Sequence, residues 1–179
     1  MVMEGQMIRV KFIILGLILS LWGLLAGCSS QLAQVSKAVP EERHLRSEIL
    51  DMRNCQSEDE MNTTLASEAP VVYQVTLAKN ATSTATGEEV EIPGEQQAIL
   101  EDELVSAYQQ EYEEATANAK QVELVIPAHM IHMYDIKWKE QTYSSSISFS
   151  MEGESCMADY TFVLKIPELK SYTTMACTA

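Results

Sequence analysis

Residues 129–166 read HMIHMYDIKWKEQTYSSSISFSMEGESCMADYTFVLKI, and apolar and polar side chains alternate through most of this stretch. Such alternation is typical of strands with one buried face, because successive side chains of a strand point to opposite sides of a sheet. We divide the stretch into three alternating runs, residues 129–139, 143–151 and 158–166. Each run is predicted to form a strand, and together they decide the fold.

Two-residue turns are predicted between these strands, at Glu140-Gln141 and at Glu152-Gly153. Both turns keep the large apolar residues of the three strands on one face, and a slip of one residue would move them to the other face. The result is an antiparallel meander. Its predicted cross-strand pairs include Trp138–Tyr143, Tyr134–Ile147, Phe149–Cys156 and Ile147–Ala158.

Residues 94–121 carry the strongest helical pattern, with no internal proline or glycine, acidic residues toward the start and a lysine near the end. Apolar residues at helical spacing form one stripe along it. Glu111 falls inside the stripe, and we expect its carboxylate to reach solvent at the stripe's edge. The stripe consists of Leu100, Leu104, Ala107, Tyr108, Ala115, Ala119 and Val122.

Residues 71–78, VVYQVTLA, add one more alternating strand that is rich in β-branched residues. The predicted fold class is therefore α+β. One long helix would pack on an antiparallel sheet of about four strands, in the order β-α-β-β-β. We place this single domain at residues 55–179.

Residues 1–27 have the layout of a secretory signal, in which two basic residues, Arg9 and Lys11, precede an uncharged apolar run. The run covers residues 12–26 and is shorter than the roughly 20 residues that a membrane-spanning helix needs. It ends in Leu25-Ala26-Gly27-Cys28, which resembles the lipobox of bacterial lipoproteins. The resemblance covers residues 1–28 only, and it implies cleavage before Cys28 and lipid attachment to its sulfur.

A lipid on Cys28 would hold the protein at the extracytoplasmic face of the cell envelope, on either the cytoplasmic or the outer membrane. Two or more acyl chains are enough for stable anchoring without other contacts to lipid. Residues 28–54 are predicted to form the lipidated tether. Within it, residues 40–54 fit a short helix or a short strand.

Four cysteines are present, and lipidation would use Cys28, which leaves three and allows at most one internal disulfide. The predicted register places Cys156 on the inward face, where a free thiol behaves as a small apolar group. Cys55 and Cys177 lie just before the first strand of the domain and at its end. We therefore predict a Cys55–Cys177 disulfide and a free, buried Cys156.

The formal net charge of −14 argues against nucleic acid and anionic lipid surfaces as partners, because both select basic patches. The chain contains neither a glycine-rich phosphate loop nor a G-x-S-x-G motif, so no cofactor and no catalytic residue is predicted.

The predicted register also places Asp135, Ser146 and Asp159 side by side on the outer face. Carboxylate and hydroxyl oxygens suit calcium, but these two aspartates would lie two strands, or ~9–10 Å, apart. We therefore predict no metal site, and Asp135 and Asp159 are kept only as candidate metal ligands. His129 and His132 are three residues apart on a strand and so point to opposite faces, which prevents them from sharing a metal.

Two functions fit these observations. The favoured one is a non-catalytic binding or structural module of the cell envelope, whose partner is an unidentified protein or glycan. The alternative is a hydrolase-like or metal-binding enzyme of the envelope, which would need Asp135, Asp159 and His132 at one concavity. The oligomeric state is not indicated by any of these patterns.

Overall fold

The computed structural model describes residues 33–178 of the chain. The signal sequence, the lipobox residues Leu25 to Gly27 and the lipidation site Cys28 lie outside these residues. Within the described part, no helix is both long enough and apolar enough to cross a membrane.

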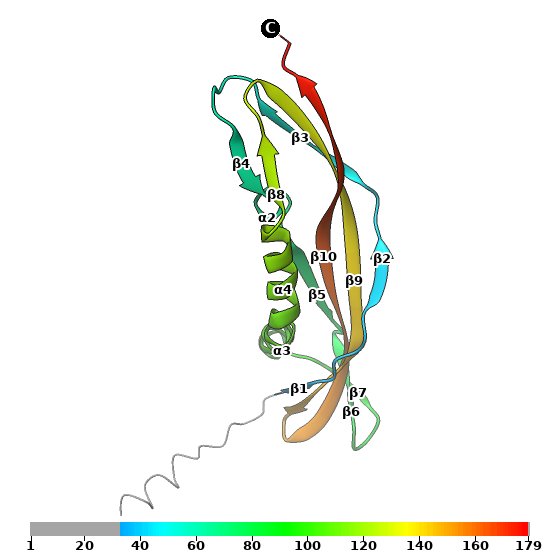
Figure 1. The fold of residues 1–179 in the computed structure, drawn as a ribbon. Helices are drawn as coiled ribbons and strands as arrows, with labels where there is room; N and C mark the ends of the chain where they lie inside the picture. Colours follow the sequence, from blue (N-terminus) through cyan, green and yellow to red (C-terminus); the bar gives the residue numbers. More distant parts are fainter. Residues whose placement is uncertain (1–32, 179) are drawn as a thin grey trace, which may run out of the picture. The chain divides into compact units, whose positions relative to one another are not determined.

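One long antiparallel hairpin dominates the fold (Figure 1). Its strands are β9 (Met130–Met151) and β10 (Glu154–Ala176), which pair along nearly their whole length. Glu152 and Gly153 connect them with positive φ angles of 53° and 84°, as a type I′ turn requires. The second predicted turn is therefore confirmed, and so is the predicted pairing of Phe149 with Cys156.

Shorter strands extend this hairpin into an eight-stranded antiparallel sheet. Three of them pair with β9 and two pair with β10. One of the two strands beside β10 pairs with a further strand on its outer side. Along β9 these strands are β1 (Ala33–Val35), β2 (Glu41–His44) and β3 (Glu48–Asn54); along β10 they are β5 (Val72–Leu77) and β6 (Asn80–Ser83), with β7 (Glu89–Glu91) beyond β6.

Three strands within residues 33–54, a range that the sequence pattern assigned to the tether, therefore belong to the sheet. Of the two possibilities for residues 40–54, the strand is confirmed, since β3 pairs with β9 and Pro40 begins no helix. The β2 strand has no recognisable pattern because its four side chains are all exposed, so burial imposes no alternation on it.

The predicted fold class is wrong. Strands contain 55% of the described residues and helices only 21%, so the unit is mostly β rather than one long helix on four strands. The predicted helix over residues 94–121 is split into α3 (Gly94–Ala107) and α4 (Gln109–Lys120). A third helix in the described part, α2 (Leu65–Glu68), is a single turn.

Tyr108 lies at the break between α3 and α4, and its side chain is fully buried. Its ring stacks on Phe162 at a centroid distance of 4.4 Å, and its hydroxyl lies 2.7 Å from the hydroxyl of Tyr160. Tyr160 in turn donates a hydrogen bond to the carbonyl oxygen of Ser36. The break between α3 and α4 thus coincides with the tertiary contacts of Tyr108. Helix propensity depends on local sequence alone and does not include such contacts.

The predicted turn at Glu140-Gln141 is also wrong, because β9 continues through both residues. The pairs that depended on it, Trp138–Tyr143 and Tyr134–Ile147, lie within this one strand and do not form. The alternation of apolar and polar residues breaks near residues 140–141 because β9 changes there which of its two faces is buried.

Buried residues of β9 are even-numbered near His132 and Tyr134 but odd-numbered near Ile147 and Phe149. The two ends of the hairpin therefore bury opposite faces, as the strong twist of a two-stranded ribbon permits. A separate two-stranded ribbon, β4 (Met61–Thr64) with β8 (Glu123–Ile126), covers the face that contains His132 and Tyr134.

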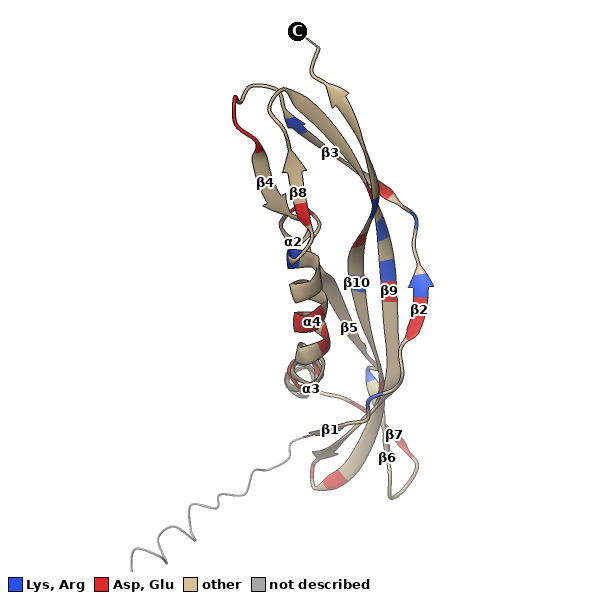
Figure 2. Ribbon diagram, viewed as in Figure 1, with Lys and Arg blue, Asp and Glu red and all other residues tan. Residues whose placement is uncertain are grey.

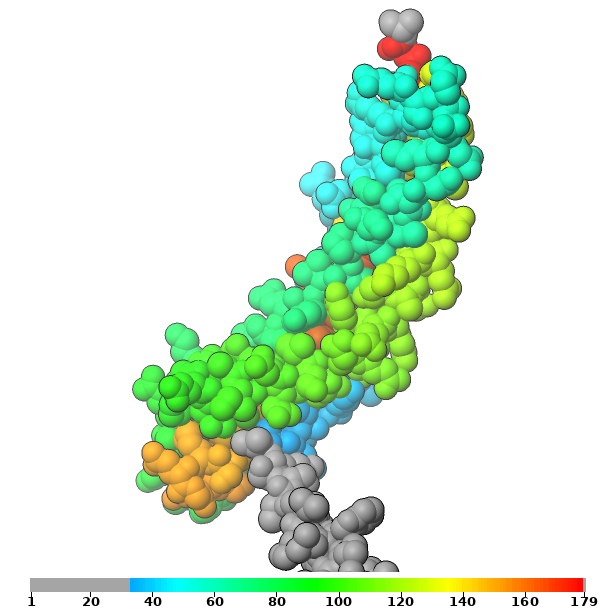
Figure 3. All heavy atoms as spheres, turned by 90° about the vertical axis from the view of Figure 1, so that its left-hand side faces the viewer, coloured from blue at the N-terminus to red at the C-terminus, as the bar shows by residue number. Residues whose placement is uncertain are grey.

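Two cores result. We name them the helix-side core, under α3 and α4, and the ribbon-side core, under β4 and β8. Figure 3 shows this side of the unit, where the green α3 and α4 are followed by the β4–β8 ribbon. The ribbon-side core comprises Met52, Leu65, Ala69, Leu124, Ile126, Tyr134 and Ile136.

The Cys55–Cys177 disulfide closes the ribbon-side end of the hairpin, with a Cα–Cα distance of 5.7 Å. Cys156 is buried in the helix-side core and is not bonded to either of these cysteines. Both predictions are confirmed. Next to the disulfide, the buried Asn54 side chain donates to the carbonyl oxygens of Asp59 and Ile126, at 2.8 and 3.0 Å.

Candidate functional site

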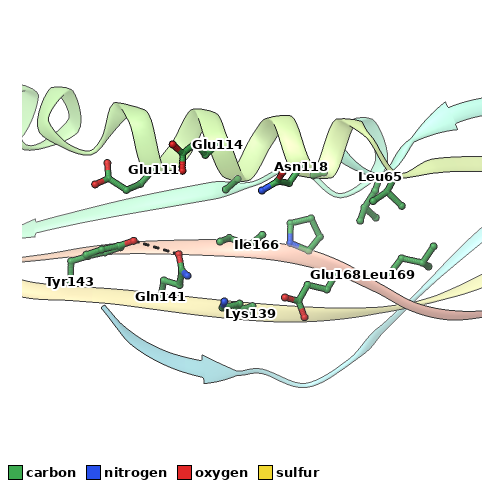
Figure 4. Close-up of a pocket in the computed structure, with 14 residues that line it drawn as sticks. Leu65, Glu111, Glu114, Asn118, Lys139, Gln141, Tyr143, Ile166, Glu168 and Leu169 are labelled. Atoms are coloured by element: carbon green, nitrogen blue, oxygen red, sulfur yellow. Dashed lines mark hydrogen bonds between the residues drawn. The ribbon is translucent and has the colours of Figure 1, made fainter. Parts of the chain in front are cut away.

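A cleft of about 650 Å³ lies between α4 and the hairpin, where the two cores meet (Figure 4). Two features of the sequence open it. The face of β9 toward α4 carries polar residues here, Lys139 and Gln141, because the buried face changes in this part of the strand. Opposite them, α4 presents the methyl groups of Ala115 and Ala119, which are too small to fill the space.

The cleft is lined by α2, α4, β9, β10 and the residue that precedes β8 by one position. Its lining residues are Leu65, Glu111, Glu114, Ala115, Asn118, Ala119, Val122, Lys139, Gln141, Tyr143, Ile166, Pro167, Glu168 and Leu169.

Three carboxylates surround the cleft. Glu111 and Glu114 are three residues apart on α4 and so share one face of the helix. Glu168 comes from β10 on the opposite wall (Figure 4). One oxygen of Glu111 accepts a hydrogen bond from Lys37 Nζ at 2.7 Å, whereas its other oxygen, Oε2, is buried without a partner among the described residues. The arrangement combines negative charge with incompletely satisfied acceptors.

Within the described part of the chain, Lys139 is the only basic residue that lines the cleft, and its ion-pair partner lies outside the lining. Its Nζ lies 2.7 Å from a carboxylate oxygen of Glu42 on β2. Gln141 Nε2 donates to the same oxygen at 2.8 Å. These two hydrogen bonds lower the pKa of Glu42 below its usual value. The charge of Lys139 is thus compensated by Glu42, and that of Glu111 by Lys37, which leaves Glu114 and Glu168 as the lining carboxylates without an ion pair among the described residues.

Tyr143 lies beside the acidic lining of the cleft. Burial raises the pKa of this phenol, and the charges of Glu111, Glu42 and Glu114 raise it further. The same charges that disfavour a phenolate at this position favour a bound cation. The cleft therefore suits a positively charged group attached to an apolar stem.

The two candidate aspartates are not brought together. Asp159 pairs with Ser146, as predicted, but Asp135 pairs with Ser171. Residues 159 and 171 are twelve positions apart on β10, so the two aspartates lie about 40 Å apart along the hairpin at the usual rise of a strand. The prediction that they lie side by side is wrong, because it depended on a turn at Glu140-Gln141. Among residues 33–178, no group of three or more His, Cys, Asp or Glu side chains is placed to hold a metal ion.

The two histidines lie in different environments. His132 is buried, and its Nδ1 lies 3.1 Å from the hydroxyl of Tyr134. Because that hydroxyl donates its proton to the carbonyl oxygen of Val125, Nδ1 of His132 must be the donor to Tyr134. His129 is exposed, with Nε2 3.4 Å from a carboxylate oxygen of Glu58. His132 is thus part of the ribbon-side packing.

Sequence reasoning found only one residue of the cleft's charged lining. Glu111 lies at the edge of the cleft, where it is partly exposed and paired with Lys37. Glu114 could have been recognised from its spacing to Glu111 on one helix. No local signal points to Glu168 or Lys139, since the pairing of β9 with β10 brings them under α4.

Comparison with protein-family models, with curated proteins and with solved structures finds no match to this chain.

Proposed function

We propose that this chain is a lipid-anchored, extracytoplasmic protein of the cell envelope that acts as a non-catalytic binding module. The anchoring is supported by the lipobox-like residues Leu25 to Cys28. The binding site in this proposal is the cleft under α4, and its ligand is a cationic side chain of a partner protein. The observation that carries the proposal is that Glu114 and Glu168 line the cleft without an ion pair among the described residues, while the lining lysine, Lys139, is already paired with Glu42.

A lysine or arginine side chain matches the cleft in both of its parts. The aliphatic stem of such a side chain can lie along apolar surface while its charged end stays near polar groups. Here the apolar surface is provided by Ala115, Ala119 and Ile166, and the carboxylates of Glu114 and Glu168 stand at the walls. The net charge of −14 also favours rapid encounter with a basic partner.

The enzyme alternative loses the residues on which it depended. It required Asp135, Asp159 and His132 at one concavity, and the hairpin holds the two aspartates about 40 Å apart.

The test measures binding of a fluorescein-labelled tetralysine peptide to the full chain in detergent, by fluorescence anisotropy at low salt. Replacing Glu114→Gln and Glu168→Gln together should weaken binding about fivefold to tenfold, since each partly exposed charge pair contributes about 0.2–1 kcal/mol. The matched control combines Asp102→Asn with Glu113→Gln, which removes the same two negative charges from positions on α3 and α4 that do not line the cleft. This control should stay within about twofold of the wild type.

Equal weakening by the control and by the double variant would contradict the proposal, because it would mean that net charge alone attracts the peptide. Failure of the wild-type chain to bind the peptide would contradict it as well.

A further inference from the structure

The two edges of the large sheet differ in their side chains. The edge beside β9 is formed by β1, β2 and β3, and its strands β2 and β3 carry charged residues at most positions, which is a common protection against pairing with another strand. Its charged residues are Glu41, Glu42, Arg43, Glu48, Asp51 and Arg53. The opposite edge is formed by β7, β5 and the last part of β10. Figure 2 shows the end of β10 without acidic or basic colour.

Pairing of β5 with β10 stops at Lys165, and the next part of the edge explains why. Ala78 N donates to the carbonyl oxygen of Asp159, so odd-numbered residues in this part of β10 direct their backbone groups toward β5. Pro167 is the next odd-numbered residue after Lys165, and it has no N–H to donate. Proline thus closes this part of the edge.

The alternation changes after Pro167, because the register shifts between Leu169 and Ser171. Beyond the shift, Cys177 N donates to the carbonyl oxygen of His129, so odd-numbered residues now face β9. The even-numbered residues therefore direct three N–H and three C=O groups away from the hairpin; these residues are Tyr172, Thr174 and Ala176.

Nothing in the described part of the chain pairs with this segment on its outer side. All residues from Lys170 to Ala176 are exposed. Lys170 lies 3.6 Å from Asp135 and is the last charged residue of the strand, and no proline follows Pro167 in it. The protective features of the edge therefore end at Lys170, and the uncharged segment 171–176 is left open.

We propose that segment 171–176 binds an extended, uncharged segment of a partner polypeptide by antiparallel strand addition. Outward N–H and C=O groups at strand spacing are complementary to another extended backbone. We assign the occupant the chemistry of β5, because this strand, with the uncharged sequence VYQVTL, already pairs antiparallel on the same side of β10, and segment 171–176 is uncharged as well. The nearby Cys55–Cys177 disulfide holds the segment in place, which lowers the entropy lost on binding.

The probe is the acetylated, amidated and fluorescein-labelled peptide VYQVTL, titrated against the full chain in detergent. Saturable binding to the wild type is expected. The variant Thr174→Pro removes one outward N–H and should weaken binding at least tenfold, whereas Thr174→Ala keeps that N–H and should bind within twofold of the wild type. Thermal melting of each variant shows whether the fold is retained.

A second measurement keeps the proposal testable even if Thr174→Pro unfolds. The same peptide with N-methyl groups on alternate residues cannot form one row of hydrogen bonds, and it should not bind the wild-type chain. Equal binding of the methylated and unmethylated peptides would overturn the proposal.

Other outcomes also decide the matter. If the peptide fails to bind but sedimentation shows a wild-type dimer that Thr174→Pro abolishes, the occupant is a second copy of this chain and the proposal is wrong. The variant with Glu114→Gln and Glu168→Gln should bind VYQVTL normally, which separates this surface from the cleft.

Discussion

The two ends of the β9–β10 hairpin are stabilised in different ways. The helix-side core contains seventeen buried residues and is closed by α3, α4 and an aromatic group around Tyr108. The ribbon-side core contains seven and is covered by only two short strands. At that end the disulfide and the hydrogen bonds of Asn54 add what apolar burial does not supply. The difference teaches that one hairpin can combine packing at one end with a covalent link at the other.

Removing the disulfide should produce the largest effect and should act on the ribbon side. Replacing both Cys55→Ser and Cys177→Ser should lower the free energy of unfolding by about 4–5 kcal/mol, because the bond closes a long loop. Urea denaturation measures the loss, and hydrogen exchange should show β3 and β8 losing protection before α3. Cys156→Ala is the control for loss of a cysteine alone. An unchanged urea midpoint in the double variant would refute this account.

A matched pair of leucines sharpens the comparison at an intermediate magnitude. Leu164 in the helix-side core and Leu124 in the ribbon-side core are both fully buried. Replacing Leu164→Ala should cost about 3–4 kcal/mol and Leu124→Ala about 2–3 kcal/mol, since a two-stranded cover can settle into the cavity more readily than a packed helix layer. Chemical denaturation of both variants gives the two values. A larger loss for Leu124→Ala would show that the ribbon is the more rigid cover.

The smallest effect on stability is expected at alkaline pH, and tyrosines of both cores contribute to it. Burial raises the pKa of Tyr143 on the helix side and of Tyr134 on the ribbon side. As pH rises, the two tyrosines therefore lose their protons in the unfolded chain before they do so in the folded chain. Their contribution to the free energy of unfolding is complete below about pH 10 and is lost as pH rises through the pKa values of the folded state. Tyr143→Phe should make the fall in stability above about pH 10 shallower. Thermal melts across this range measure it, and parallel curves for the two proteins would argue against the assignment.

Much of the helix-side end could be predicted from local pattern. Gly153 marks the turn of the hairpin because it adopts a positive φ, and the turn fixes the pairing of Phe149 with Cys156. The buried positions of α3 and α4 follow from helical spacing, although the break at Tyr108 depends on contacts with distant residues. The disulfide followed from the positions of Cys55 and Cys177 at the ends of the predicted domain.

The cleft could not be predicted, because it arises where the hairpin changes its buried face. A change from even to odd buried positions is produced equally by a two-residue turn and by a twisted strand. The residues themselves offered one distinction, since Glu140-Gln141 lacks a glycine or asparagine suited to positive φ whereas Glu152-Gly153 has one. Glu168 and Lys139 then meet α4 only through long-range pairing.

The pairing of β1 with the turn end of β9 places the start of the described chain far from the open segment of β10. Ala33, where the described chain begins, lies opposite Phe149, while the open segment of β10 lies opposite residues 130–135. At the rise of an extended strand, these two places are about 50–60 Å apart. If Cys28 carries a lipid, as its resemblance to a lipobox implies, four residues separate it from Ala33. The length of β9 would then set how far from the point of attachment a partner can be reached.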